Sequence, residues 1–78
     1  MKTMSDWTPY IEQDPEVMMG KPVLKGTRLT VEHVLRELGS GQSEAEILAG
    51  YPRLTIEHVR AAQAYAADVL ACEEVIFG

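Results

Sequence analysis

Residues 28–34 read Arg-Leu-Thr-Val-Glu-His-Val, and residues 53–59 repeat them as Arg-Leu-Thr-Ile-Glu-His-Val with a single change. In both copies the threonine is suited to cap a helix, because its hydroxyl accepts a backbone N–H that the first turn leaves unpaired. The leucine before it and the valine four residues after it form a hydrophobic staple, and the glutamate favours the positive end of the helix dipole. The repeat therefore predicts that one helix starts after Thr30 and another after Thr55, while two copies are too few for a solenoid.

Hydrophobic periodicity extends these two helices and places a shorter one between them. An apolar stripe with helical spacing follows the first threonine cap, and Gly39 ends it. Ser43, with Glu46 three residues later, is a capping box that opens the middle helix, and Gly50 closes it. We expect helices over about residues 31–39, 44–49 and 56–73.

The residues before Thr30 carry strand and turn signals. Tyr10–Gln13 and Val23–Leu24 read as two short strands bounded by proline and glycine, and Pro22 confines the second strand to an edge. Two strands alone are barely stable in water, so we expect a hairpin or ribbon that packs on the helices or pairs with a second chain. The predicted organisation is a loose arm over residues 1–9, a single domain over 10–74 with its β arm at 10–30, and an apolar tail over 75–78.

The spacing of the last two helices is compatible with a helix-turn-helix motif. When Gly50 is aligned with the turn glycine of that motif, five apolar residues fall on the positions that pack the two helices together. These are Ala45, Ala49, Tyr51, Ile56 and Val59. Glu46 and Pro52 depart from the pattern, and any three-helix bundle with short loops has the same periodicity. The predicted fold class is mainly α, a three-helix homeodomain-like helix-turn-helix bundle with a short N-terminal β-hairpin or ribbon.

Composition limits the classes of function. The chain has 78 residues and a net charge of −5, which argues against broad attraction to nucleic acid but allows a local basic patch. Cys72 is the single cysteine, so no disulfide forms within the chain, and a reducing, cytoplasmic setting is expected. The sequence shows no secretory leader, no apolar run long enough for a membrane span, and no set of ligands that suggests a metal or another cofactor.

Two groups of residues are candidates for DNA contact. The early outward residues of the last helix are expected to be Glu57, His58, Arg60, Ala61 and Gln63. Of these, only Arg60 and Gln63 match common base-reading side chains. Lys21, Lys25 and Arg28 give residues 17–31 a local charge of +3, although such charges also guard exposed strand edges. With Arg53 added, the candidate DNA contacts are Lys21, Lys25, Arg28, Arg53, Arg60 and Gln63.

Catalysis finds little support in the sequence. His33 has Glu37 one turn away and His58 has Glu57 beside it, but neither histidine has a plausible nucleophile nearby. Cys72 has no neighbouring cation in the sequence that would activate its thiol. We therefore expect a binding protein rather than an enzyme.

The last helix indicates a binding partner. Its apolar residues form one stripe and also spread onto other faces, which is typical of a helix that is covered on more than one side. A domain of 78 residues is too small to cover such a helix alone, so a homodimer or a partner protein is expected. The candidate partner-binding residues are Tyr65, Val69, Cys72, Val75, Ile76 and Phe77.

Several ordered motifs give the chain a resemblance to a known family. They are Asp14-Pro15, Gly20-Lys21-Pro22-Val23, the run from Lys25 to Val31, Ile47-Leu48, the run from Tyr51 to Thr55, and Ala64-Tyr65. Over residues 10–70 the chain resembles the family catalogued as domain of unknown function 433, with Met19 standing where a glycine is usual.

This resemblance implies a prokaryotic protein with a small homeodomain-like helical fold and a β N-terminal arm. It also implies a role found in some relatives, a VapB-type antitoxin paired with a PIN-like ribonuclease toxin. Three hypotheses follow: an antitoxin-like subunit that silences such a toxin, a DNA-binding regulator that acts on its own operon, and a homodimeric module with another partner.

Overall fold

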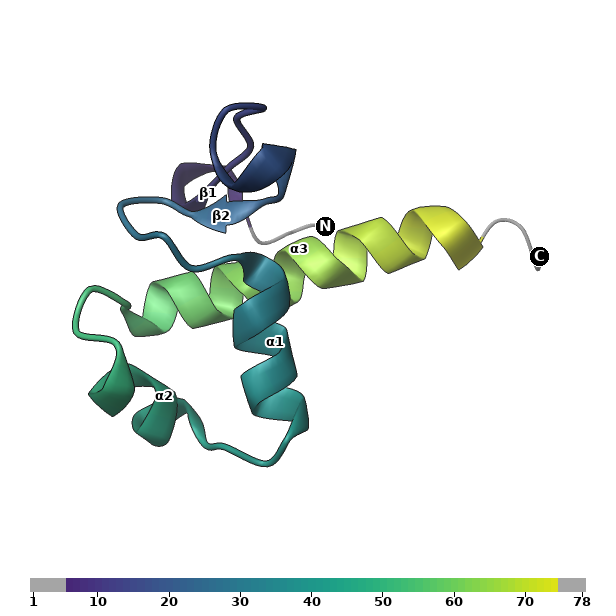
Figure 1. The fold of residues 1–78 in the computed structure, drawn as a ribbon. Coiled ribbons are helices and arrows are strands. Elements are labelled where there is room, and N and C mark those ends of the chain that lie inside the picture. Colours follow the sequence, from purple (N-terminus) through teal and green to yellow (C-terminus); the bar gives the residue numbers. More distant parts are fainter. Residues whose placement is uncertain (1–5, 75–78) are drawn as a thin grey trace.

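The computed structural model describes residues 6–74 of the chain, and their side chains as far as residue 71. It is mainly helical, and it contains the three helices and the short antiparallel sheet expected from the sequence (Figure 1). The helices are α1 (Val31–Gly39), α2 (Glu44–Gly50) and α3 (Ile56–Glu74), and the strands are β1 (Ile11–Glu12) and β2 (Val23–Leu24). Two single-turn 3-10 helices are also present: η1 (Thr8–Tyr10) precedes β1, and η2 (Met18–Gly20) lies between β1 and β2.

Each helix begins at the capping residue that the sequence predicted. The hydroxyl of Thr30 accepts the amide of His33 at 3.0 Å, and the hydroxyl of Thr55 accepts the amide of His58 at 3.2 Å. Ser43 and Glu46 form the reciprocal bonds of a capping box, at 3.1 and 2.7 Å. The repeated heptapeptide is therefore explained by two helix starts with the same cap.

The two strands form a short hairpin that leads directly into α1. Ile11 pairs with Leu24, and Glu12 pairs with Val23. A further bridge joins Val23 to Thr30, and the amide of Val31 donates to the carbonyl of Pro22 at 3.0 Å. The hairpin therefore fixes the position of the first residue of α1 as well as its own register.

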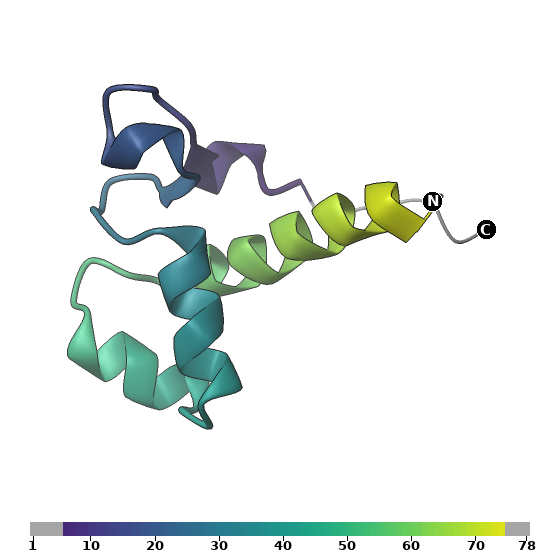
Figure 2. The same cartoon turned by 45° about the vertical axis from the view of Figure 1, so that its right-hand side comes forward.

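The core lies where the three helices and the hairpin meet. Leu24, Val34, Ile47, Val59 and Ala62 have no exposed surface. The hairpin and α2 lie on opposite sides of the first half of α3, while its second half projects beyond the other elements (Figures 1 and 2). In this projecting part of α3, every described side chain from Ala67 to Ala71 is exposed.

The packing of α2 corrects the alignment with a helix-turn-helix. Ala45 and Ala49, predicted to pack against the last helix, are exposed, while Ile47 is fully buried. A buried isoleucine removes more apolar area from water than two alanines, so the short helix turns its Ile47 side inward. Tyr51, Ile56 and Val59 do pack into or against the core as predicted.

The N-terminal segment corrects two further expectations. Residues 7–9, predicted to belong to a loose arm, lie on α3, where the ring of Trp7 packs edge-on against Tyr65. His58 and Ala61, predicted to point outward, are half-buried and buried, because Tyr10 and the residues around it cover that side of α3. Packing of the N-terminal segment on α3 removes water from the aromatic rings of the segment and from an apolar face of the helix.

Candidate functional site: an apolar groove beside the third helix

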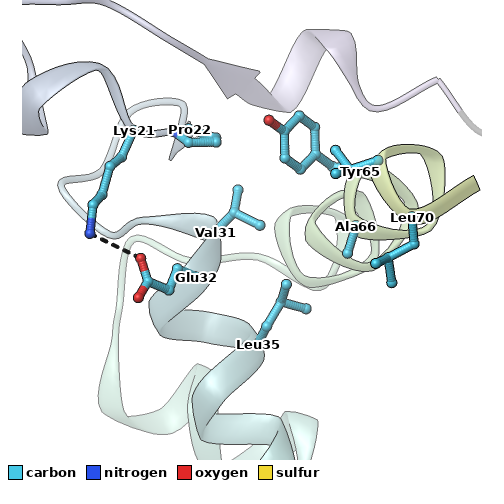
Figure 3. Close-up of a pocket in the computed structure, with 9 residues that line it drawn as sticks. Lys21, Pro22, Val31, Glu32, Leu35, Tyr65, Ala66 and Leu70 are labelled. Atoms are coloured by element: carbon cyan, nitrogen blue, oxygen red, sulfur yellow. Dashed lines mark hydrogen bonds and ion pairs between the residues drawn. The ribbon is translucent and has the colours of Figure 1, made fainter. Parts of the chain in front are cut away.

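A groove of about 420 Å³ runs between the start of α1 and the second half of α3 (Figure 3). Its walls are mostly apolar, and Val31 and Leu35 of α1 face Ala66 and Leu70 of α3 across it. The complete lining is Lys21, Pro22, Val31, Glu32, Leu35, Tyr65, Ala66, Val69 and Leu70.

Helical spacing places these side chains in the groove. Val31 and Leu35 lie one turn apart on α1, and Ala66 and Leu70 lie one turn apart on α3, so each pair shares a face of its helix. Val31 is buried, but Val69 is 41% exposed and Leu70 is 60% exposed. The groove therefore changes from a closed end at the core to an open end made of large apolar side chains.

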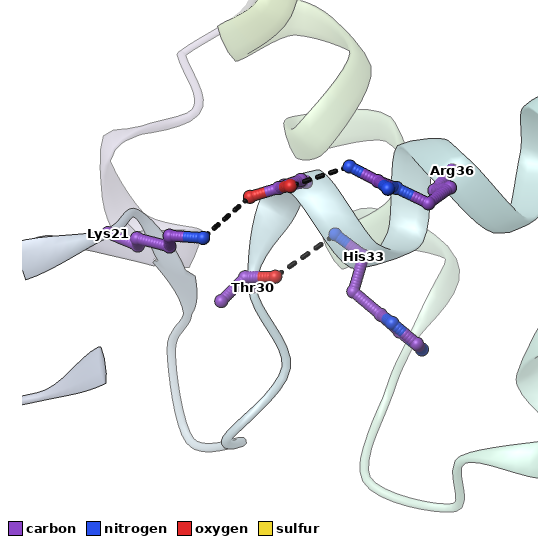
Figure 4. A network of polar contacts seen from close by, with 5 residues as sticks. Lys21, Thr30, His33 and Arg36 are labelled. Carbon is purple, nitrogen blue, oxygen red and sulfur yellow. Dashed lines mark hydrogen bonds and ion pairs between the residues drawn. The ribbon is translucent and has the colours of Figure 1, made fainter. Parts of the chain in front are cut away.

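A charged network borders the groove on the side of α1 (Figure 4). Lys21 Nζ donates to Glu32 Oε1 at 3.0 Å, and Arg36 Nη2 donates to Glu32 Oε2 at 2.6 Å. The hydrogen bond from Lys21, together with the positive charges of Lys21 and Arg36, lowers the pKa of the Glu32 carboxyl below its ordinary value. This network gives an apolar groove a polar rim, as is usual at protein interfaces.

The N-terminal segment supports the groove from the other side of α3. Trp7 and Tyr65 meet edge to face, with ring centroids 4.8 Å apart and planes at 87°. The indole Nε1 of Trp7 also donates to Asp68 Oδ2 at 2.7 Å. Because these contacts hold Tyr65, one wall of the groove depends on a residue far away in the sequence.

The predicted partner-binding residues divide into two groups. Tyr65 and Val69 line the groove together, as members of one surface. The side chain of Cys72 and all of Val75, Ile76 and Phe77 lie outside the described residues.

Sequence reasoning did not assign Pro22, Val31, Leu35, Ala66 and Leu70 to this surface. The sequence could have identified Leu70, because it belongs to the same apolar stripe of α3 as Val69 and lies near the C-terminal end of that long helix, where a small domain has little surface to cover it. The α1 residues carry no such signal, because their stripe reads as ordinary core packing. Only the angle at which α1 meets α3 turns part of that stripe into a groove wall.

The predicted DNA contacts do not form one surface. Lys21 is held by Glu32 at the rim of the apolar groove, and Arg60 lines a separate hollow with Trp7 and Tyr10. Lys25 and Gln63 are exposed. Arg28 and Arg53 do come together, on one cleft at the loops that precede α1 and α3.

The hollow at Arg60 contains a carboxylate that is already engaged. Asp6 lines it and accepts hydrogen bonds from both the hydroxyl and the amide of Thr8. These two bonds lower the pKa of the Asp6 carboxyl, the hydroxyl contributing more. Asp6 thus holds the first residue of η1 through its backbone amide and its hydroxyl.

Both histidines make structural contacts. His33 Nε2 lies 2.8 Å from the hydroxyl of Tyr51, which joins α1 to the loop after α2. His58 Nδ1 accepts the amide of Thr55 at 3.0 Å, and its Nε2 donates to the carbonyl of Lys25 at 2.9 Å. His58 therefore extends the cap of α3 and ties that helix to the turn after β2.

A family model and a solved structure identify one family for this chain. A family model described as "Protein of unknown function (DUF433)" matches residues 11–66. This range includes the α1 wall of the groove and Tyr65 and Ala66, and it stops before Val69 and Leu70.

Two relatives extend this result. The chain is 33% identical over 69 residues to the uncharacterized protein y4eO of Sinorhizobium fredii, a match that covers 87% of this chain but 31% of that protein. The crystal structure of a DUF433 member from Anabaena variabilis has a TM-score of 0.73 and 32% identity, covering 76% of this chain and 58% of the other. The chain thus spans less than a third of the length of the curated relative. Because the family model covers well over half of the sequence, the chain belongs to the DUF433 family.

Proposed function

We propose that this chain is a non-catalytic, antitoxin-like subunit that binds and silences a PIN-like ribonuclease through the apolar groove beside α3. The observation that carries this proposal is the pair of large apolar side chains, Val69 and Leu70, exposed at the open end of the groove. Exposed apolar surface that is rimmed by charged groups is typical of a protein-binding site.

The energetics favour a protein partner. Full burial of a valine or leucine side chain is worth about 1.5–3 kcal/mol. Because Val69 is 41% and Leu70 is 60% exposed, covering the surface that remains would contribute roughly 1.5–3 kcal/mol in total. A contribution of this size corresponds to roughly a 10- to 100-fold change in the dissociation constant of a complex.

Charge and sequence support a ribonuclease as the occupant. An enzyme that acts on RNA uses lysine and arginine to hold phosphates, and the net charge of −5 on this chain complements such a surface. The sequence also stays apolar after the described part of α3, at Val75, Ile76 and Phe77. The antitoxin role implied by the family resemblance is consistent with both features.

The same sequence favours inhibition by covering the enzyme. Residues 61–78 contain no lysine or arginine, so this part of the chain has no cation that could enter a carboxylate-rich metal site. An apolar helix face that blocks substrate access would achieve inhibition without such a residue. The long relative y4eO would then carry this binding module within a larger protein.

Co-expression with the product of the adjacent open reading frame tests the proposal. We expect the neighbouring protein to arrest growth when expressed alone, and this chain to restore growth and copurify with it. If the two proteins neither form a complex nor show relief of toxicity, the proposal is wrong. A homodimer in light scattering, with no binding of the neighbour, would instead support a self-association module.

A further inference from the structure

The two copies of the repeated heptapeptide meet in space at their first residues. Arg28 and Arg53 hold equivalent places, two residues before the threonine caps of α1 and α3. Both line a single cleft of about 530 Å³, whose remaining walls are Gly26 and Thr27. A second hollow of about 290 Å³ adjoins it, and the same two arginines line that hollow as well. The repeat therefore produces a paired feature that neither copy has alone.

Hydrogen bonds fix the loop that presents Arg28. The amide of Thr27 donates to the carbonyl of Leu24 at 3.0 Å across a turn in which Gly26 has a φ of +83°. The hydroxyl of Thr27 donates to the same carbonyl at 2.7 Å and accepts the amide of Leu29 at 3.0 Å. Arg28 therefore extends from a preorganised backbone.

The second loop is held against the first. The amide of Leu54 donates to the carbonyl of Tyr51 at 2.9 Å, and Leu54 is buried in the core. His58 donates to the carbonyl of Lys25, which connects the start of α3 to the turn that carries Gly26. The backbone of Arg53 thus cannot move away from the loop of Arg28 without breaking these contacts.

The charges of the cleft are not balanced within the described part of the chain. Lys21 and Arg36 are paired with Glu32, whereas neither Arg28 nor Arg53 makes an ion pair with any residue from 6 to 71. Among the residues with described side chains, no carboxylate lines the cleft, although acidic residues outnumber basic ones twelve to seven in the whole chain. Two guanidinium groups at one cleft repel each other, and an anion between them removes that repulsion.

We infer that this cleft binds a phosphate group, held between the guanidinium groups of Arg28 and Arg53. Arginine presents planar, paired donors that match phosphate oxygens, and it keeps its charge at any physiological pH. The phosphate can belong to a nucleic-acid backbone or be a free ion, and both sources use the same two side chains. This site is separate from the apolar groove, so it goes beyond the proposed partner binding.

Amide chemical shifts of the full-length protein, titrated with inorganic phosphate and separately with a short duplex DNA, test the inference. The unmodified chain is compared with Arg28→Gln, with Arg53→Gln, with the two changes combined, and with Arg36→Gln. The last variant removes one positive charge at a residue outside the cleft and outside the candidate DNA contacts. All three arginines are exposed, and the amide spectrum itself reports whether each variant is folded.

We expect shifts at residues 26–29 and 53–55, an affinity at least tenfold lower in the combined cleft variant, and a smaller loss in each single cleft variant than in the combined one. Arg36→Gln should bind like the parent. For the duplex, removing two phosphate contacts should also reduce the slope of log K against log salt by about 1.8. Shifts with inorganic phosphate identify a free phosphate site, and shifts with the duplex alone identify a backbone site. Absent shifts with both probes, or a loss in Arg36→Gln as large as that in Arg28→Gln, would overturn the inference.

Discussion

Met19 adopts a backbone conformation that a side chain makes costly. Its φ is +58° and its ψ is +33°, in the left-handed region, and it lies between Met18 and Gly20, which also have positive φ. Its side chain is 92% exposed and has little packing to lose. The side chain of Met19 therefore carries a conformational cost that no burial offsets.

Replacing Met19 with glycine should stabilise the protein. A residue with a Cβ in the left-handed region costs roughly 1–2 kcal/mol, and glycine removes this cost. The greater conformational freedom of glycine in the unfolded chain offsets up to about 1 kcal/mol of the stability gained. We expect Met19→Gly to raise the melting temperature by a few degrees in a thermal unfolding scan. Met19→Ala, which keeps the Cβ, serves as the control and should melt close to the parent; an equal gain in both variants would contradict the role of φ.

Glu32 should make the stability depend on pH. Its pKa is lowered in the folded state by Lys21 and Arg36, so its contribution is present above the ordinary glutamate pKa of 4.5 and is lost as the pH falls through the folded value. Glu32→Gln should therefore melt below the parent at pH 7 in low salt, and the two should converge as the solution is acidified. High salt should remove the difference at pH 7, because the pairs are exposed; a difference that persists in acid would refute this explanation.

Short-range contacts of single residues could be predicted from the sequence, and long-range ones could not. The capping residues Thr30, Ser43 and Thr55 accept hydrogen bonds from amides three residues ahead, so the local sequence is enough to predict these contacts. The partners of His33 and His58 lie 18 and 33 residues away, and only the folded chain brings them together. For that reason the residues around the two histidines in the sequence do not indicate these contacts.

At the scale of elements, the N-terminal segment determines which faces of α3 are available. Contacts from η1 and β1 cover the side that carries Ala61 and Tyr65, while α1 and α2 cover the side of Val59 and Ala62. Neither cover extends far enough to bury the second half of α3, and every side chain from Ala67 to Ala71 is exposed, Val69 and Leu70 among them. Three contacts of Trp7 and Tyr10 with residues of α3, two aromatic and one a hydrogen bond, produce this arrangement. A segment with a single helical turn has too little hydrophobic periodicity for such contacts to be predicted from the sequence.

Trp7 is the residue that fastens the segment to α3. Trp7→Ala removes the edge-on contact with Tyr65 and the hydrogen bond to Asp68, and for a half-buried tryptophan we expect a loss of about 2 kcal/mol. Chemical denaturation measures this loss. Trp7→Phe, which keeps a ring and loses the hydrogen bond, should lose roughly half as much; a Trp7→Ala variant as stable as the parent would show that the segment does not pack on α3.

The direction in which α2 packs shows the limit of reasoning from pattern. Its seven residues contain apolar side chains on more than one face. The sequence is therefore compatible both with packing through Ala45 and Ala49, as in the helix-turn-helix alignment, and with packing through Ile47. The choice follows from the space that α1 and α3 leave, in which Ile47 is fully buried and Ala45 and Ala49 face solvent. Helix positions follow from local periodicity, whereas helix orientation follows from the whole core.

At the scale of the whole molecule, the two candidate binding surfaces lie toward opposite ends of α3. Arg53 precedes the helix, and Val69 and Leu70 belong to its second half, which places them about 20 Å apart along the axis at 1.5 Å per residue. A protein partner in the groove and a phosphate group in the arginine cleft would therefore contact opposite ends of α3. No helix in the described part of the chain has the length and apolarity that a membrane crossing requires.

The affinity of the complex for two neighbouring variants tests the partner-binding groove most directly. Leu70 lines the groove, whereas Ala71 is exposed one residue later on another face of α3, and Leu70→Glu and Ala71→Glu introduce the same charge without disfavouring a helix. Isothermal titration calorimetry with the toxin-like neighbour should give a dissociation constant at least tenfold weaker for Leu70→Glu and within about twofold of the parent for Ala71→Glu. Equal affinities for the two variants would show that the partner does not occupy the groove.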